Sequence, residues 1–176
     1  MLVIGLANAA LAAAIRRLRG FLIYSSTRIE EMRAGEYALH VQAEGLGITN
    51  TGGVEGHRPF LVSLMGPRIG DESVFDAEHS VSGDHKSLSG YTPTHAVDVI
   101  AFRNRPVDHV VTTLLTAAII DEIGGIANAE LREDQLPIVA GLPGLVITTT
   151  DPWPAARGSA TFLRARAEQP GFRILK

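Results

Sequence analysis

The sequence of 176 residues contains no cysteine and no excess of basic residues. The lack of cysteine excludes disulfides, zinc–thiolate sites and a cysteine nucleophile, and it is compatible with the cytoplasm, where we expect the protein to act. The 16 Lys and Arg residues stand against 19 Asp and Glu, which gives a net charge of −3. Because general nucleic-acid binders usually carry a basic surplus, we expect no nucleic-acid partner. The basic residues of 157–176 alternate with apolar ones, as expected for a solvated face.

The apolar N-terminal run lacks the features of a secretory signal or a membrane span. Residues 1–15 are uncharged, but they are too few to cross a bilayer. A signal peptide carries its basic residues before its apolar region, whereas here the basic residues begin after the apolar region, at Arg16. We therefore expect no membrane partner. We predict instead a strand over 2–6, followed by a helix that Asn8 caps and that ends at Gly20. The predicted buried positions of this helix are Leu11, Ile15 and Leu18.

Motifs for common cofactors and nucleophiles are also missing. The stretch after the first predicted strand, Gly-Leu-Ala-Asn-Ala-Ala, lacks the spaced glycines of a phosphate or dinucleotide loop. Ser159 lies between Gly158 and Ala160, outside a nucleophile-elbow pattern, and capping a helix is a sufficient role for it. We therefore expect no cofactor and no serine nucleophile.

Residues 97–131 are the clearest packed unit in the sequence. They begin with the β-branched and aromatic residues of a strand and continue as an apolar run with helical spacing over 107–123. Asn104 is placed to cap this helix, and Pro106 suits its first turn. The pair Gly124-Gly125 fits a left-handed stop, and a second strand follows it.

Length and element order predict a single globular domain, 1–176, of the α+β class. The order is β-α-β-β-β-loop-β-α-β-β-α-β, in which several strands follow one another without an intervening helix. Such an order favours a mostly antiparallel or mixed sheet with about three helices packed on it. Outside the central unit, the predicted strands are 2–6, 21–29, 36–43, 59–65, 145–150 and 172–175. The predicted helices there are the first one, which ends at Gly20, and the last one, 160–168.

Residues 68–94 form the longest stretch without periodicity, and such segments inside a compact domain are usually functional or mobile. Between residues 71 and 84 the chain has no Lys or Arg and carries the acids Asp71, Glu72, Asp76, Glu78 and Asp84. A solvated loop and a negative surface for a basic partner both fit this composition. We predict no metal site, because the acids and the nearby His79 and His85 lack the spacing of a calcium loop.

Asp108 and His109 lie at the start of the predicted central helix. An acid/base pair would need the two side chains to converge, but adjacent helix residues point in different directions. We predict that Asp108 complements the helix dipole in the first turn, and that His109 forms a hydrogen bond or is half-exposed.

Three stretches of the second half resemble a bacterial family of small proteins of unknown function. They are Arg103-Asn104-Arg105-Pro106-Val107-Asp108-His109 with Ile123-Gly124-Gly125-Ile126, Gly141-Leu142-Pro143-Gly144-Leu145-Val146, and Ala160-Thr161-Phe162-Leu163-Arg164-Ala165 with Pro170-Gly171-Phe172-Arg173-Ile174-Leu175-Lys176. The first half agrees in outline, through the stretch Pro59–Leu64. Members of that family often carry an Asp shortly before the Phe-Leu pair, where this chain has Gly158 and Ser159, so a role of that Asp is not carried over. The resemblance implies no established activity; in size and character such proteins are similar to immunity proteins, which bind and neutralise a toxin.

The first hypothesis is therefore an immunity-type binding protein, not an enzyme, that occludes the active site of a cognate bacterial toxin. Its predicted contact residues are Asp71, Glu72, Asp76, Glu78 and Asp84, which would pair with basic residues of the toxin or mimic a nucleic acid or nucleotide. The alternative is an enzyme of unknown class with a site assembled from Asp108, His109 and the histidines His79 and His85 of the 71–85 loop. A third hypothesis is a subunit of a structural assembly, which an extended exposed apolar patch would indicate.

Overall fold

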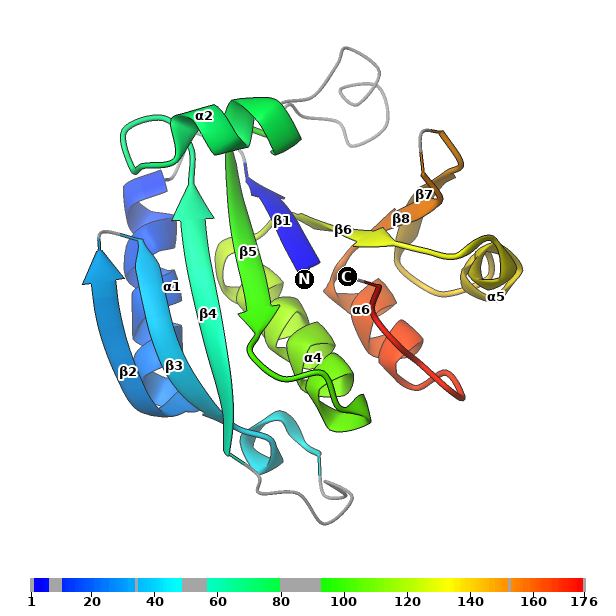
Figure 1. Cartoon of the computed structure of the whole chain (residues 1–176), viewed down its shortest axis with the longest axis horizontal. Helices are drawn as coiled ribbons and strands as arrows, with labels where there is room; N and C mark the ends of the chain where they lie inside the picture. Colours follow the sequence, from blue (N-terminus) through cyan, green and yellow to red (C-terminus); the bar gives the residue numbers. More distant parts are fainter. Residues whose placement is uncertain are drawn as a thin grey trace.

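The computed structural model describes residues 2–6, 11–33, 35–48, 57–79, 93–151 and 153–175. Within these residues the framework is one eight-stranded sheet with the order β2-β3-β4-β5-β1-β6-β8-β7, in which all neighbouring strands are antiparallel (Figure 1). The strands are β1 (Leu2–Leu6), β2 (Ser26–Arg33), β3 (Glu36–Gln42), β4 (His57–Met65), β5 (His95–Ala101), β6 (Ile126–Glu130), β7 (Leu145–Thr149) and β8 (Ala155–Gly158). The α+β class and the antiparallel sheet are therefore confirmed.

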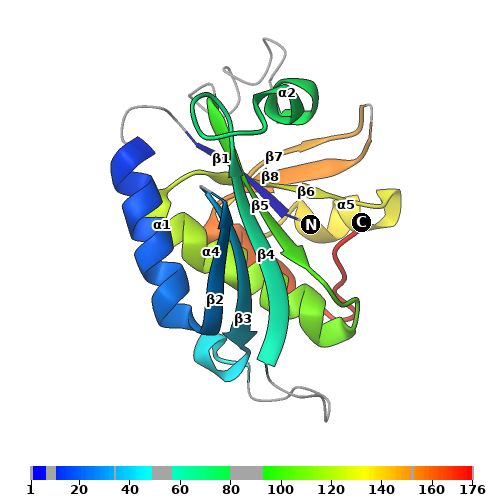
Figure 2. The same ribbon diagram turned by 60° about the vertical axis from the view of Figure 1, so that its left-hand side comes forward.

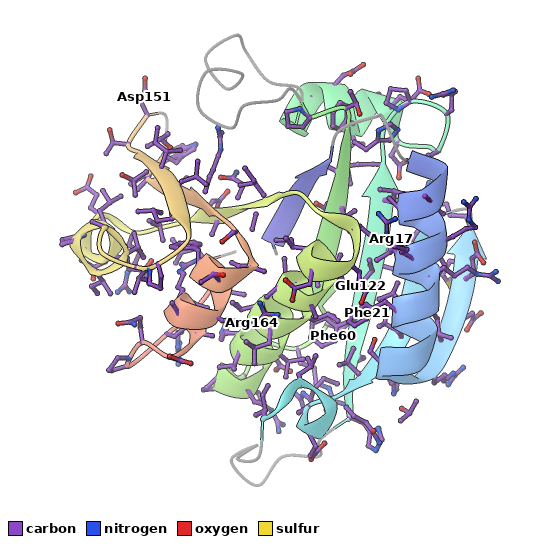
Figure 3. The ribbon with its side chains drawn as sticks, turned by 180° about the vertical axis from the view of Figure 1, so that it is seen from behind. Arg17, Phe21, Phe60, Glu122, Asp151 and Arg164 are labelled. Carbon is purple, nitrogen blue, oxygen red and sulfur yellow. The ribbon has the colours of Figure 1, made fainter. Side chains whose placement is uncertain are left out.

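Three of the described helices, α1 (Leu11–Ser25), α4 (Pro106–Ile123) and α6 (Ala160–Ala167), lie side by side on one face of the sheet, with α4 in the middle (Figure 3). Arg17 donates a hydrogen bond of 2.7 Å to the Glu122 carbonyl oxygen, and Arg164 forms an ion pair with Asp121. Both arginines also complement the negative C-terminal end of the α4 dipole. The shorter helical segments are η2 (Glu44–Leu46), α2 (Glu72–Val74), the π-helical turn η3 (Phe75–His79), η4 (Glu133–Gln135) and α5 (Leu136–Val139).

The main core lies between these three helices and the sheet, because alternate strand residues point toward the helices. In β3, Tyr37, Leu39 and Val41 are buried as the alternation predicts, while His40 and Gln42 are exposed. The central helix α4 is buried over most of its surface. Its buried threonines satisfy their hydroxyl groups by donating to carbonyl oxygens one turn back.

A second, smaller core lies on the opposite face of the sheet. Met65 of β4 and Ala96 of β5 are cross-strand partners that alternate with residues buried against the helices. Phe75 of η3 packs against both of them. The short helical segment formed by α2 and η3 therefore covers one end of the face that the three long helices leave open (Figure 2).

The first helix is longer than predicted. It continues through Gly20 to Ser25, so the predicted stop at Gly20 is wrong and the predicted strand 21–29 begins only at Ser26. Buried side chains recur every four residues along this helix, at Ala14, Leu18 and Leu22, and their packing outweighs the cost of one exposed glycine. The predicted cap, Asn8, lies outside the described residues.

The C-terminal part differs from the predicted order. β8 is absent from the prediction because Ala-Ala-Arg-Gly lacks β-branched residues, yet it pairs with both β6 and β7. The predicted last strand, 172–175, is wrong, because these residues form no strand in the structure. The segment is held by side-chain packing instead: Ile174 is buried, and the Arg166 guanidinium lies 5.3 Å from the centre of the Phe172 ring. The chain therefore ends in β-β-α instead of β-α-β.

The central unit is confirmed as β5, α4 and β6, with a different cap. Arg105 takes the N-cap position in place of Asn104, because its backbone N donates a hydrogen bond of 2.8 Å to the Asp108 carboxylate. Gly124 and Gly125 both have positive φ, as the predicted stop requires, although ψ of Gly124 is −175° and not that of a left-handed helix. Part of the segment predicted to be irregular, 68–94, is helical in α2 and η3.

Candidate binding face

The face of the sheet opposite the three long helices is the candidate functional surface. Strand register places six polar residues in one row across the strands, which we call the polar row: Arg33, Glu36, Ser63, Asp98, Asn128 and Arg157. Between its fourth and fifth members the row crosses β1 at Val3. Directly opposite residues of antiparallel strands project to the same side, so register fixes where these polar groups lie. Ser63 and Asp98 are nearly buried, whereas Arg33 and Asn128 are exposed.

The acidic segment, Asp71 to His79, begins beside one end of the polar row. Nη1 of Arg33 lies 3.1 Å from Oδ1 of Asp71, and Arg33 also forms an ion pair with Glu36. The hydrogen bonds to these two carboxylates raise the pKa of Arg33 above its ordinary value. Glu72 accepts a hydrogen bond of 2.6 Å from the backbone N of Arg68. Two of the predicted contact acids, Asp71 and Glu72, are thus positioned by partners within the chain.

A strained turn leads into the acidic segment. Arg68 and Asp71 have φ of 70° and 52°, values that residues with a side chain seldom adopt. Gly66 has φ of 131°, and a Cβ there would lie 2.7 Å from the ring of the buried His95. Nε2 of His95 lies 3.1 Å from the Pro67 carbonyl oxygen. The turn keeps its strained backbone because buried neighbours fix it on one side and the Asp71 ion pair fixes it on the other.

The structure brings three of the five predicted contact acids together at this end of the sheet. Asp76 is exposed on η3, close in sequence to Asp71 and Glu72. Glu78 also falls in η3, but its side chain is not among those that the structure describes, and Asp84 lies outside the described residues. Phe75 fixes the segment to the sheet, so Asp71, Glu72 and Asp76 stand on a packed element.

A shallow hollow of about 210 Å³ lies near the other end of the strands. Its walls include Arg28 and Glu30 of β2, His40 of β3, Pro59 of β4 and, just after β5, Phe102. Phe102 is 61% exposed, and its backbone N donates to the Pro59 carbonyl oxygen. An exposed aromatic ring beside charged groups is typical of the residues that anchor protein interfaces.

Asp108 is buried and holds the first turn of α4 in place. Nε and Nη2 of Arg58 both lie 2.6 Å from Oδ1 of Asp108, and Oδ2 accepts the hydrogen bond from Arg105 N. Burial by itself would raise the pKa of Asp108, but the hydrogen bonds from Arg58 and Arg105 outweigh it and hold the pKa below its ordinary value. The predicted place of Asp108 in the first turn is confirmed, and its partner is an arginine of β4 on the other side of the core.

The described residues do not test the alternative catalytic set, because the side chain of His79 is not described and His85 lies outside the described ranges. His109 is buried, so the half-exposed position predicted as one possibility is wrong. The described ranges contain no group of three or more His, Asp or Glu side chains that could hold a metal ion. None of the helices in the described part of the chain has the length and apolar character to cross a membrane.

The sequence model of a family of unknown function, DUF6368, matches residues 1–176. The chain belongs to the DUF6368 family. This match covers the first half as well as the stretches from residue 97 onward that carry the resemblance noted from the sequence. Comparisons with curated proteins and with solved structures found no match. Membership of DUF6368 therefore assigns no activity to the face described above.

Two charged features of this DUF6368 chain do not follow from local sequence pattern. The Arg58–Asp108 pair joins residues 50 positions apart, and the polar row exists only once the strand register is known. One signal for the pair is present in β4, where Arg58 takes an inward position in alternation with Phe60 and Val62. An arginine at such a position needs a buried partner, and Asp108 supplies it.

Proposed function

We propose that this protein is an immunity-type binding protein, which neutralises a cognate bacterial toxin by binding to it and occluding its active site. The observation that supports the proposal most directly is the anchored acidic segment. Phe75 fixes this segment to the sheet, and internal hydrogen bonds position Asp71 and Glu72. Acids that are ordered before binding lose less conformational entropy when a partner docks. We place this activity in the cytoplasm.

The partner that fits best carries a basic active-site cleft. Complementary charges steer two proteins toward one another and fix their relative orientation. Glu72 and Asp76 are exposed on this segment, whereas the charge of Asp71 is offset by Arg33, so this end of the sheet presents exposed carboxylates beside an internal ion pair. Toxins that act on nucleic acids or nucleotides must hold phosphate groups, and their clefts are therefore basic. The polar row and the hollow beside Phe102 lie on the same face and would extend the contact.

The first experiment co-expresses this chain with the product of the neighbouring gene. We expect the two proteins to co-purify as a complex, and we expect cells that produce the neighbouring protein to grow only when this chain is present. If the neighbouring protein neither forms a complex nor harms cells that lack this chain, the proposal is wrong.

A charge reversal then tests the acidic segment as the contact. Asp76→Lys should slow association severalfold at low ionic strength, because the charges of a whole surface together change association rates by roughly 10–1,000-fold and this substitution reverses one of them. Glu168→Lys is the matched control, since Glu168 is an exposed acid just after α6, on the side of the helices. Association of Asp76→Lys at the rate of the unaltered chain in low salt would remove the acidic segment from the contact.

A further inference from the structure

The two outer strands of the sheet are protected against further pairing to different degrees. β2 reads Ser-Thr-Arg-Ile-Glu-Glu-Met-Arg, and charged side chains of this kind keep an edge strand from pairing with another chain. β7, at the opposite edge, reads Leu-Val-Ile-Thr-Thr and carries neither charge nor proline, although its pairing with β8 shifts register between Leu145 and Ile147. Among the described strands only β8 pairs with β7. One edge of the sheet is therefore blocked, and the other has the composition of a strand that accepts a partner.

Exposed apolar side chains lie on β7 and on the segments at both of its ends. Val146 of β7 is 44% exposed, and Trp153, in the turn after β7, is 73% exposed. Ile138 of α5, which precedes β7 in the chain, is 53% exposed. Figure 1 shows β7, β8 and α5 at the side of the molecule away from β2. Three exposed apolar side chains thus lie on β7 or on the segments that flank it in the chain.

We propose that β7 pairs with β7 of a second copy of this chain, in antiparallel orientation about a two-fold axis. A pair centred on Ile147 places Leu145 opposite Thr149 of the second copy, and Val146 opposite Thr148 of the second copy. No like charges meet in such a pair, and cross-strand contacts between β-branched residues are favourable. The two sheets then form one continuous antiparallel sheet.

Pairing through a two-fold axis explains why the two edges differ. The same edge is used in both copies, so the charged β2 strands become the two outer ends and the assembly stops growing. Pairing of β7 with β2 of another copy would be head-to-tail and would lead to open filaments, and the charges of β2 oppose it. In the antiparallel pair each end of β7 lies beside the opposite end in the second copy. Trp153 of one copy therefore comes to the α5 side of the other, where Ile138 is exposed.

Sedimentation velocity over a range of protein concentrations tests the proposal. We expect the unaltered chain to sediment with twice the mass of one chain, and Val146→Lys to sediment as a monomer with an unchanged circular dichroism spectrum. Met32→Lys is the matched control, since Met32 is an exposed apolar residue of the opposite edge strand, and it should remain a dimer. A monomer at every soluble concentration of the unaltered chain overturns the proposal, and so does a dimer that Val146→Lys leaves intact.

Single cysteines give a second measurement that does not depend on a destabilising change. The chain has no cysteine of its own, so a cysteine introduced into β7 has only the second copy's cysteine as a partner. Directly opposite residues of antiparallel strands have Cα atoms about 4.5–5.5 Å apart, within the reach of a disulfide. Under mild oxidation Ile147→Cys, which lies opposite itself in the proposed pair, should form a covalent dimer, whereas Val146→Cys, Thr148→Cys and Met32→Cys should not. Failure of Ile147→Cys to cross-link overturns the two-fold pair centred on Ile147.

Discussion

The buried ion pair between Arg58 and Asp108 tests how the helix layer is held to the sheet. Arg58 is on the core side of β4 and Asp108 is in the first turn of α4, so the pair joins a central strand to the central helix. Replacing one partner leaves the other charge buried and uncompensated, which typically costs about 3–5 kcal/mol. We expect Asp108→Asn to lose about this much unfolding free energy, although its amide oxygen can still accept the hydrogen bond from Arg105. Arg58→Met should have a similar cost.

The double variant Arg58→Met/Asp108→Asn separates the cost of a lone charge from the value of the pair. It removes both charges, so its cost should be smaller than the sum of the single costs by about 2–4 kcal/mol. A domain of this kind has a total unfolding free energy of about 5–15 kcal/mol, so each single loss is large enough to measure well. Urea unfolding at neutral pH, followed by far-ultraviolet circular dichroism, gives the four values of the cycle. The reasoning would be refuted if each single variant lost less than about 1 kcal/mol of unfolding free energy, as at exposed ion pairs. It would also be refuted if the loss in the double variant equalled the sum of the two single losses.

Acid titration gives a second readout of the same pair. The pKa of Asp108 is lower in the folded chain than in the unfolded chain, so its ionised form favours folding at every pH above the unfolded value. This contribution is lost as the pH falls through the lower, folded value. The difference in unfolding free energy between the unaltered chain and Asp108→Asn should therefore be complete at neutral pH and shrink in acid. A difference that stays constant until the chain unfolds would mean that Asp108 acts through its shape and hydrogen bonds and not through its charge.

Four further substitutions test the first helix, the β8 packing, the acidic segment and the last helix. Gly20→Ala should stabilise the chain by up to about 1 kcal/mol in urea unfolding, because α1 continues through Gly20 and the space around it is open. Gly158→Ala should cost about 1–3 kcal/mol in the same assay, because a Cβ there would lie 2.3 Å from the Phe162 side chain. Phe75→Ala should increase hydrogen exchange over the acidic segment much more than elsewhere, and unchanged exchange there would contradict its role as the anchor. Arg166→Met should lower the unfolding free energy by less than about 1 kcal/mol or raise it. Burial lowers the pKa of Arg166 to about 10, and among the described residues its contacts are the Glu130 carbonyl oxygen and the Phe172 ring, not a carboxylate.

The elements that the sequence predicts best are those whose local signals agree with one another along their length. β3 alternates between buried and exposed residues, and α4 is a long apolar run, buried over most of its surface, between a proline and two glycines. Both lie within one residue of their predicted bounds. In these segments the local preference and the tertiary packing favour the same structure, so no further information is needed.

The first helix shows how local signals fail when packing favours a different boundary. Gly20 resembles a stop, and the residues after it include the β-branched and aromatic residues of a strand. Yet Leu22 is fully buried one turn beyond Leu18, so the core-facing stripe continues past the glycine. Arg166 shows the same effect for charge: it belongs to a basic segment, but the helix turns its side chain into the interior. Neither outcome follows from composition.

The candidate site could be predicted in composition but not in geometry. The acids of the 71–79 segment are evident from the sequence, whereas the partner of Asp71 is Arg33, 38 residues earlier in the chain. Phe75 could not be recognised as an anchor, because its neighbours Met65 and Ala96 come from two different strands. The polar row likewise depends on register, which a shift of one residue would move to the opposite face.

The proposed two-fold pair and the proposed binding face lead to a joint expectation. Antiparallel pairing of β7 with itself requires an axis perpendicular to the sheet, so both helix layers lie on one side of the dimer and both binding faces lie on the other. The two acidic segments then belong to opposite halves of one surface, each remote from the pairing edge because Arg33 and β7 lie at opposite ends of the strand order. Val146→Lys should therefore abolish the dimer without changing the association rate per chain, and Asp76→Lys should slow association without changing the mass. If either substitution altered both measurements, the edge and the acidic segment would be parts of one interface, and the two proposals would have to be replaced by a single one.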